Sequence, residues 1–226
     1  MHVPVLLDRC LELLGPAVNE PDAVLVDATL GLGGHSEAFL AAFPGLTLVG
    51  VDRDPIASAM AAQRLASFGE RFVPRAGEHE NLASLLATIN GGRINAILFD
   101  LGVSSMQLDE PQRGFSYSRD APLDMRMNPQ DELTAAQIVN TYTEGELVGV
   151  LRDYGEERSA RRVAKAIIAA RKVAPITSTA ELAELVRDAI PQAAKRTGGH
   201  PAKRTFQALR IEINRELQGL PAALDA

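Results

Sequence analysis

Several features are scarce in this sequence, and each shortage excludes a class of protein. Cys10 is the only cysteine, so no disulfide forms within the chain and we expect a reducing compartment. The opening residues Met1–Pro4 contain no basic n-region of a secretory signal, and no segment approaches the ~20 apolar residues of a membrane span. We therefore expect a cytoplasmic protein.

Motifs for two common kinds of ligand are also missing. The chain contains no G-x-x-x-x-G-K-[ST] pattern, which excludes a phosphate-binding P-loop. The histidines show neither paired ligand spacing nor a cysteine partner, so we expect no metal site. These histidines are His2, His35, His79 and His200.

The residues that are present suit a globular protein with an uneven distribution of charge. Of the 226 residues, 46% are hydrophobic, which is enough for a sizeable core, and the net charge is −6. Residues 152–216 nevertheless hold 14 Lys and Arg against 8 Asp and Glu, a net charge of +6, which leaves −12 for the rest of the chain. This segment either faces phosphate groups or forms solvated helices of mixed charge.

The first half of the chain alternates between short apolar runs and helical patterns. The expected strands are Val24–Leu30, Thr47–Asp52, Phe72–Ala76 and Ala96–Asp100. The expected helices are Gly34–Phe43, Pro55–Phe68 and Glu80–Ile89, and Asp54 is the expected N-cap of the second. This alternation predicts an α/β fold with a parallel sheet that helices cover on both faces.

The character of the sequence changes after Gly102. Residues 109–131 are rich in Pro, Gly, Asp and Ser, which is typical of an extended loop, and helical patterns follow it. We expect helices over 134–142, 144–153, 156–173, 179–190 and 201–218. The predicted layout is an α/β core over 1–108, a helical insertion over 109–195 and a return helix of the core over 196–226.

Helix-start signals support several of these boundaries. Thr143 with Glu146, and Ser178 with Glu181, have the spacing of a capping box. Pro201 is expected at the first position of the last helix, with Leu217 at the end of its apolar stripe.

A glycine-rich loop follows the first expected strand. Glycines at a strand-to-helix turn let a ligand approach the backbone, and Asp52, about twenty residues on, ends the second strand where a carboxylate binds ribose hydroxyls. The dinucleotide pattern that starts at Gly31 requires Gly or Ala at the position of Ser36, which favours a nucleoside such as S-adenosylmethionine over NAD. A glycine turn that only connects strand and helix stays as the simpler alternative.

Asp100 lies at the end of the fourth expected strand and is followed by Ser104 and Ser105. The carboxyl edge of an open α/β sheet is where ligands bind, so this cluster is a candidate for the reacting end of the site. Asp and Ser also commonly cap and turn chains, so the cluster alone is a weak signal.

These features together resemble the bacterial small-subunit ribosomal RNA cytosine-N4 methyltransferases. The strings that carry the resemblance are His2–Leu7, Asp27–Ser36, Val51–Pro55, Asp100–Gln107, Arg113–Ser116, Pro122–Met127, Tyr154–Arg158, His200–Ala202 and Arg204–Ile211. The resemblance implies a Rossmann-like class I methyltransferase core with an inserted helical domain, and S-adenosylmethionine as the methyl donor. It also implies small-subunit ribosomal RNA as the partner, in the assembled small subunit, and leaves open whether the chain forms a homodimer.

The resemblance implies particular site residues. The implied cofactor contacts are Gly33, Gly34, His35, Asp52, His79, Asp100 and Gln107. Asp100 is also the candidate catalytic residue, because an acceptor on the cytosine N4–H helps to localise the nitrogen lone pair, and nearby backbone carbonyls are the alternative acceptors. His79 stands where relatives often have an aromatic residue. Members of the family continue beyond residue 226 into further strands, so a non-catalytic RNA- or ribosome-binding protein is the alternative.

RNA contacts are expected in the helical insertion. The candidate phosphate-binding residues are Arg158, Arg161, Arg162, Lys165, Arg171, Lys195, Arg196, Lys203 and Arg204. We expect Arg113–Ser116 and Leu123–Met127 to line the entrance for a cytosine that is single-stranded or flipped out of a helix.

Overall fold

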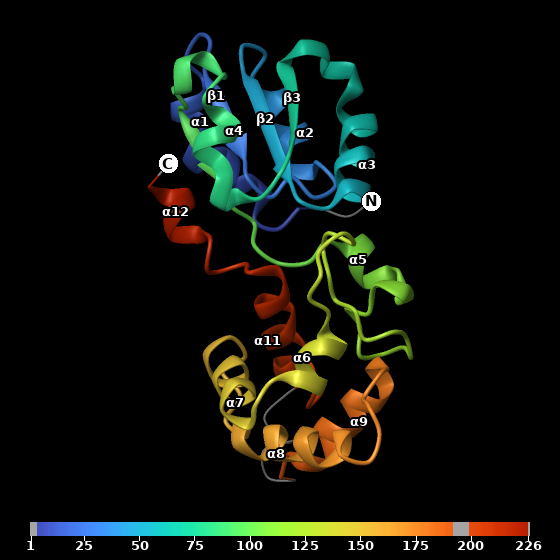
Figure 1. Ribbon diagram of the computed structural model, residues 1–226. Coiled ribbons are helices and arrows are strands. Elements are labelled where there is room, and N and C mark those ends of the chain that lie inside the picture. The colour runs from blue at the N-terminus through green and yellow to red at the C-terminus, as the bar shows by residue number, and fades with distance from the viewer. Residues whose placement is uncertain (1–3, 192–198, 226) are drawn as a thin grey trace. The chain divides into compact units, whose positions relative to one another are not determined.

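The computed structural model describes residues 4–191 and 199–225, which fall into two compact units (Figure 1). The core unit comprises Met1–Ser104 and Leu217–Ala226, and the helical unit comprises Ser105–Glu216. The helical unit is therefore an insertion in the sequence of the core unit. Among the described residues, no helix is both long enough and apolar enough to cross a membrane.

A four-stranded parallel sheet forms the centre of the core unit. Its strands are β1 (Val24–Asp27), β2 (Thr47–Asp52), β3 (Phe72–Ala76) and β4 (Ala96–Leu98), in the order β3-β2-β1-β4. In the register of the sheet, Val26 is the partner of Val49 on one side and of Ile97 on the other. This order is that of a doubly wound Rossmann-like sheet, which confirms the predicted α/β class.

Alternate residues of the strands pack against helices on opposite faces. Leu25 and Leu48 lie in one core cluster with residues of α1, α2 and α3. Val26 and Val49 point the other way, into a cluster with residues of α4 and α12. The helices are α1 (Leu7–Val18), α2 (Gly34–Ala42), α3 (Pro55–Leu65), α4 (Leu82–Leu86) and α12 (Leu220–Leu224).

Several expected helix boundaries hold and others shift. Asp54 is the N-cap of α3, because its carboxylate accepts from the amides of Ile56 at 3.0 Å and Ala57 at 3.4 Å. The expected helix Glu80–Ile89 is shorter, and 3-10 turns flank α4. The 3-10 turns of the core unit are η1 (Ala66–Arg71), η2 (His79–Asn81) and η3 (Asn90–Gly92).

The described helices of the helical unit begin with a short segment and continue with longer ones. They are α5 (Ser105–Asp109), η4 (Pro111–Arg113), α6 (Ala135–Thr141), α7 (Glu144–Asp153), α8 (Ala160–Arg171), α9 (Thr179–Ala189) and α11 (Lys203–Asn214).

The capping signals of this unit are only partly as predicted. The capping box of Thr143 and Glu146 is present. Ser178 accepts from the Glu181 amide as expected, but the Glu181 carboxylate accepts from the Thr177 amide instead of the N-cap amide. Thr134 forms a further capping box, which the sequence analysis did not identify.

The last predicted helix differs from the observed α11 at both ends. Pro201 lies in the turn before α11, and the helix ends at Asn214 because Arg215 adopts a left-handed conformation with φ of 49°. Leu217 is therefore outside the helix and 43% exposed, which contradicts its place on the apolar stripe. The helical unit extends beyond the expected 109–195 because α11 packs against α6 and α7.

Candidate functional site

Acidic residues gather at the carboxyl edge of the sheet in the core unit. Asp27 ends β1, Asp52 ends β2, and Asp100 follows β4 after one intervening residue. Since the strands are parallel and adjacent, their ends meet at the same edge. This edge is the usual ligand-binding position in open α/β sheets.

Asp52 holds the glycine loop in place. Its Oδ2 accepts from the Gly31 amide at 2.7 Å, and its Oδ1 accepts from the Asp54 amide at 2.8 Å. Burial raises the pKa of Asp52, although these two amide hydrogen bonds oppose the rise. Each carboxylate oxygen can accept a second hydrogen bond, so Asp52 retains acceptor capacity for a pair of ligand hydroxyls.

Gly33 and Gly34 are required by the packing of the loop. Gly33 is the N-cap of α2 with φ of 74°, and a Cβ there would lie 3.1 Å from Leu65 Cδ1. A Cβ on Gly34 would lie 2.7 Å from Pro4 Cγ. The close approach at Gly34 is thus to the N-terminal segment of the chain itself.

His35 lies between that N-terminal segment and Asp100. Its Nε2 is 2.9 Å from the Val5 carbonyl oxygen, which only accepts, so Nε2 carries the proton and Nδ1 is the acceptor in the neutral ring. His35 Nδ1 lies 3.8 Å from Asp100 Oδ2, too far for a direct hydrogen bond. The Asp100 amide donates to Thr29 Oγ1 at 2.6 Å, which fixes the backbone while its side chain stays 47% exposed.

Asp27 is a buried carboxylate beneath this loop. It accepts from Ser36 Oγ at 2.7 Å and from the Thr29 amide at 3.3 Å, and it is 2% exposed. Burial raises the pKa of Asp27 to about 6, with the hydrogen bonds of Ser36 and Thr29 acting in the opposite direction. The structure therefore links Asp27 through Thr29 to Asp100.

His79 lies in η2, just after β3. The Gly77 amide donates to the Asp52 carbonyl at 3.1 Å, which places this segment beside the end of β2. The His79 ring meets the edge of Phe99, with ring centroids 6.3 Å apart and an interplanar angle of 86°. An imidazole and a phenyl ring thus lie near the site where the sequence analysis expected a single aromatic contact.

Gln107 belongs to a different unit from the other predicted cofactor residues. It lies in α5 of the helical unit and is buried there. The other predicted cofactor residues belong to the core unit, namely Gly33, Gly34, His35, Asp52, His79 and Asp100.

Two residues of the site were not singled out from the sequence. Thr29 bridges Asp27 and Asp100, and Phe99 packs against His79. The signal for Thr29 was its position two residues after a strand-ending aspartate, where a hydroxyl can reach the neighbouring strand end. Phe99 was hidden because it reads as the continuation of an apolar strand.

Most of the described candidate phosphate-binding residues are exposed. Five of them have side chains that form no hydrogen bond or ion pair with another described residue. These are Arg158, Arg161, Arg162, Lys165 and Lys203. Arg171 is different, because its guanidinium donates to the carbonyls of Val139 at 2.9 Å and Tyr142 at 2.7 Å and caps the end of α6. Lys195 and Arg196 lie outside the described residues.

The segment expected to line the target entrance is a packed part of the helical unit. Leu123, Met125 and Met127 are 2%, 0% and 7% exposed, so the prediction that they line an open entrance is wrong. Asn214 holds this segment by accepting from the Met127 amide at 2.7 Å and donating to the Met125 carbonyl at 2.9 Å. Arg113 donates to the Met127 carbonyl at 2.7 Å.

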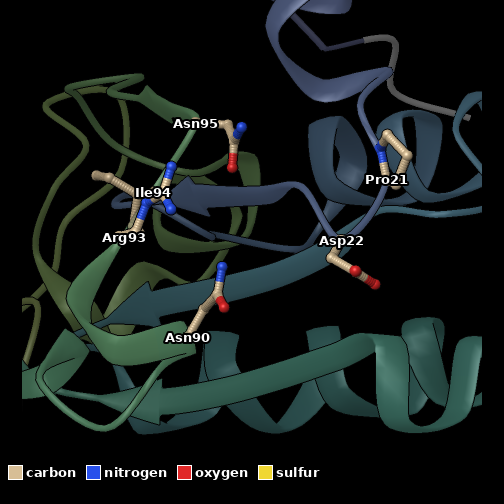
Figure 2. A pocket seen from close by; sticks show the side chains of 6 residues that line it. All are labelled: Pro21, Asp22, Asn90, Arg93, Ile94 and Asn95. Atoms are coloured by element: carbon tan, nitrogen blue, oxygen red, sulfur yellow. The ribbon is translucent and has the colours of Figure 1, made fainter.

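A pocket of the core unit lies away from the carboxyl edge. It is lined by Pro21, Asp22, Asn90, Arg93, Ile94 and Asn95 (Figure 2). Asn95 Oδ1 accepts from the Val24 amide at 3.0 Å, at the point where β1 begins. The pocket thus belongs to the amino edge of the sheet, opposite the acidic residues.

Within residues 4–191 and 199–225, no cluster of three or more His, Cys, Asp or Glu is placed to hold a metal ion.

The fold and the strand-end residues define the class of this protein as a Rossmann-like α/β core with an acidic ligand-binding edge. A model of the MraW methylase family matches residues 1–226, so the chain belongs to that family.

Its relatives are longer proteins. The chain is 60% identical over 225 residues to "Ribosomal RNA small subunit methyltransferase H" of Mycolicibacterium gilvum, covering 100% of this chain and 61% of the relative. The protein of the same name from Mycolicibacterium smegmatis is 60% identical over 230 residues, covering 100% and 62%. That of Streptomyces avermitilis is 55% identical over 225 residues, covering 100% and 71%. The chain thus spans about three fifths of the first two relatives.

Proposed function

We propose that this chain is the cofactor-binding and RNA-recognition part of an S-adenosylmethionine-dependent methyltransferase that modifies the N4 amino group of a cytosine in small-subunit ribosomal RNA. The proposal rests chiefly on the Asp52 carboxylate, which is held 2.7 Å from the Gly31 amide at the carboxyl edge of the sheet. Family membership and relatives at 60% identity that are named as ribosomal RNA methyltransferases support it.

The residues of the core unit fit a bound nucleoside. Asp52 would accept from the ribose hydroxyls, and the loop at Gly33 and Gly34 would pass close to the ligand. His79 and Phe99 would contact the adenine, because their rings already lie together in the segments that follow β3 and β4. His35, Asp100 and Gln107 would contact the methionine part. When bound, S-adenosylmethionine supplies an electrophilic methyl group on a sulfonium sulfur.

Asp100 is suited to the acceptor side of the reaction. In the transfer a bond forms between cytosine N4 and the methyl carbon, the sulfur–carbon bond breaks, and N4 loses a proton. The Asp100 carboxylate is half exposed while its amide is anchored on Thr29, so it can accept a hydrogen bond from the N4–H without losing its position. Positioned base assistance of this kind typically contributes about 10²–10⁴-fold.

The exposed basic residues of the helical unit support RNA as the partner. A cytosine amino group inside a helix is inaccessible, so the target must be single-stranded or extruded from its stack. Cations at Arg158, Arg161, Arg162, Lys165 and Lys203 would neutralise phosphates around such a target. We propose the assembled small subunit as the substrate, in the cytoplasm, and leave the homodimer as an open question of oligomeric state.

A non-catalytic RNA- or ribosome-binding protein is the second candidate. The observation that favours it is the set of exposed basic side chains on the helical unit, which can bind RNA whether or not a methyl group is transferred. Both candidates predict RNA binding, and they differ in whether a methyl donor is bound and used.

Calorimetric titration of the 226-residue chain with S-adenosylmethionine and with NAD tests the proposal. We expect saturable binding of S-adenosylmethionine and none of NAD. Transfer of a radiolabelled methyl group to small ribosomal subunits that lack the modification then measures turnover, with an extended chain of the length of the relatives as the positive control. Failure of both chains to bind S-adenosylmethionine contradicts the proposal. RNA binding without donor binding in either chain favours the second candidate.

A further inference from the structure

Three aromatic rings form a cluster at the start of α11 in the helical unit. The rings of Tyr117 and His200 are stacked, with centroids 4.5 Å apart and an interplanar angle of 13°. Phe206 meets the edge of Tyr117, with centroids 5.6 Å apart and an angle of 85°. Phe206 is 4% exposed, so it anchors the cluster in the core of the unit.

The outer ring of this cluster is exposed and fixed in orientation. His200 is an exposed residue, although one face of its ring is covered by Tyr117. The Ala202 amide donates to His200 Nδ1 at 3.2 Å, so the neutral ring carries its proton on Nε2. The imidazole is therefore a flat ring in a fixed orientation, with Nε2–H as a hydrogen-bond donor at its edge. A further planar group can stack on this ring.

Cationic side chains adjoin the cluster. Lys203 and Arg204 are exposed in the first turn of α11, and the Lys203 amide donates to the His200 carbonyl at 3.0 Å. Arg204 donates to the Glu156 carbonyl at 3.1 Å, which brings the turn between α7 and α8 beside the start of α11. The exposed Arg158 follows in that turn.

We propose that the stacked pair of Tyr117 and His200 is a binding site for an unpaired base of the RNA substrate, with Lys203 and Arg204 on the adjacent phosphates. This inference rests on the proposed function and adds the place where a nucleotide outside the reacting cytosine is held. Planar rings bind unpaired bases with little regard to sequence, and nearby cations follow the backbone of a single strand. A base that stacks on His200 would thus fix the position of the RNA strand along the protein.

The test measures binding of a short single-stranded RNA and of the same sequence as a duplex, by fluorescence anisotropy with the 226-residue chain. His200→Ala removes the outer ring and should weaken single-strand binding about tenfold, from the usual size of a base-stacking contribution. The duplex has no unpaired base to stack and should lose no more than about twofold. His200→Phe keeps a flat ring without the Nδ1 acceptor and should retain most of the single-strand affinity.

Three controls accompany the binding measurement. Thermal unfolding of each variant detects loss of structure at the start of α11, and titration with S-adenosylmethionine reports on the core unit separately. Arg152→Ala removes an exposed cation that is already paired with Asp153 at 2.7 Å, so it should leave RNA binding unchanged. The inference is overturned if folded His200→Ala binds single strands as wild type does, or if His200→Phe is as weak as His200→Ala. Intact donor binding in a chain that binds no RNA would overturn this inference while leaving the cofactor part of the proposed function standing.

Discussion

Ser36 Oγ donates a hydrogen bond of 2.7 Å to Asp27 Oδ2, and both residues are buried beneath the glycine loop. The Ser36 hydroxyl is thereby engaged below the loop, at the position where a dinucleotide-binding loop has its third small residue. This relationship gives Ser36 a structural reason to be where it is. It also means that folding changes the pKa of Asp27, because the carboxylate is buried and bonded to Ser36 only in the folded chain.

Asp27→Asn should change how stability depends on pH. Because burial raises the pKa of Asp27 to about 6, the folded state binds this proton more tightly than the unfolded state, where the pKa is near 3.8. The contribution of Asp27 is therefore present below pH ~4 and is lost as the pH rises through ~6. Between pH 4 and pH 7.5, the free energy of unfolding of wild type should fall by about 2–3 kcal/mol more than that of Asp27→Asn. Denaturant unfolding at a series of pH values measures this difference.

Ser36→Ala is the matched control for that experiment. It removes a hydrogen bond that stabilises the charged carboxylate, so the pKa of Asp27 should rise further. The fall in the free energy of unfolding should then extend to a higher pH than in wild type. Parallel pH profiles for wild type and Asp27→Asn would contradict the assignment of this dependence to Asp27.

Asp52→Asn should weaken S-adenosylmethionine binding about tenfold or more. The amide keeps only one acceptor oxygen, whereas the carboxylate now holds the Gly31 and Asp54 amides and would also take ribose hydroxyls. Asp22→Asn is the control, because Asp22 lines the pocket at the opposite edge and has φ of 56°, which asparagine tolerates. Calorimetry that finds equal donor affinity for both variants would remove Asp52 from the site.

Asp100→Asn should reduce methyl transfer without reducing the stability of the fold. The side chain is 47% exposed, and the anchoring hydrogen bond to Thr29 comes from the backbone, so the variant should unfold at the temperature of wild type. Methyl transfer in the extended chain should fall by about 10²-fold if the carboxylate assists loss of the N4 proton. Normal donor binding together with normal turnover would take the proposed role from Asp100.

The sheet was predictable because its signals are local. β1 and β2 are short apolar runs that end at Asp27 and Asp52, and two adjacent residues, Asp54 and Pro55, mark the start of α3. The strand-end aspartates followed from the same pattern. Thr29 and Phe99 did not, since their contacts with Asp100 and His79 join segments that are far apart in the sequence.

The helical unit was harder to predict because its constraints join distant residues. The side chain of Asn214 holds Met125 and Met127, which lie almost ninety residues earlier in the sequence. No local pattern marks such a contact, so the buried segment looked like an exposed loop. The same contact places α11 in the helical unit instead of the core.

Charge reversal at Arg161 and Arg162 should flatten the salt dependence of RNA binding. Both side chains are exposed on α8, and each phosphate contact to a single strand contributes about −0.7 to the slope of log affinity against log salt. Arg161→Glu with Arg162→Glu should therefore reduce the slope by at least about 1. The control is Arg152→Glu with Arg187→Glu, which changes the net charge equally at arginines already paired with Asp153 and Asp188. Equal slopes for the two double variants would place the RNA elsewhere.

Gly114→Ala should destabilise the helical unit by more than its backbone conformation alone explains. Gly114 has φ of 70°, and an added Cβ would overlap the Pro122 carbonyl oxygen and lie 2.8 Å from the Asp124 amide nitrogen. Both of these are backbone atoms of the packed segment, so the neighbours cannot move aside as a flexible side chain would. Gly199→Ala is the control, because Gly199 has φ of 86° and no atom of the described residues lies within 4 Å of an added Cβ. A left-handed alanine costs about 1–2 kcal/mol, so chemical unfolding should show that loss for Gly199→Ala and a clearly larger one for Gly114→Ala. If the two losses are equal, the segment that contains Pro122 and Asp124 is free to shift and is not the rigid support that its contacts with Asn214 and Arg113 indicate.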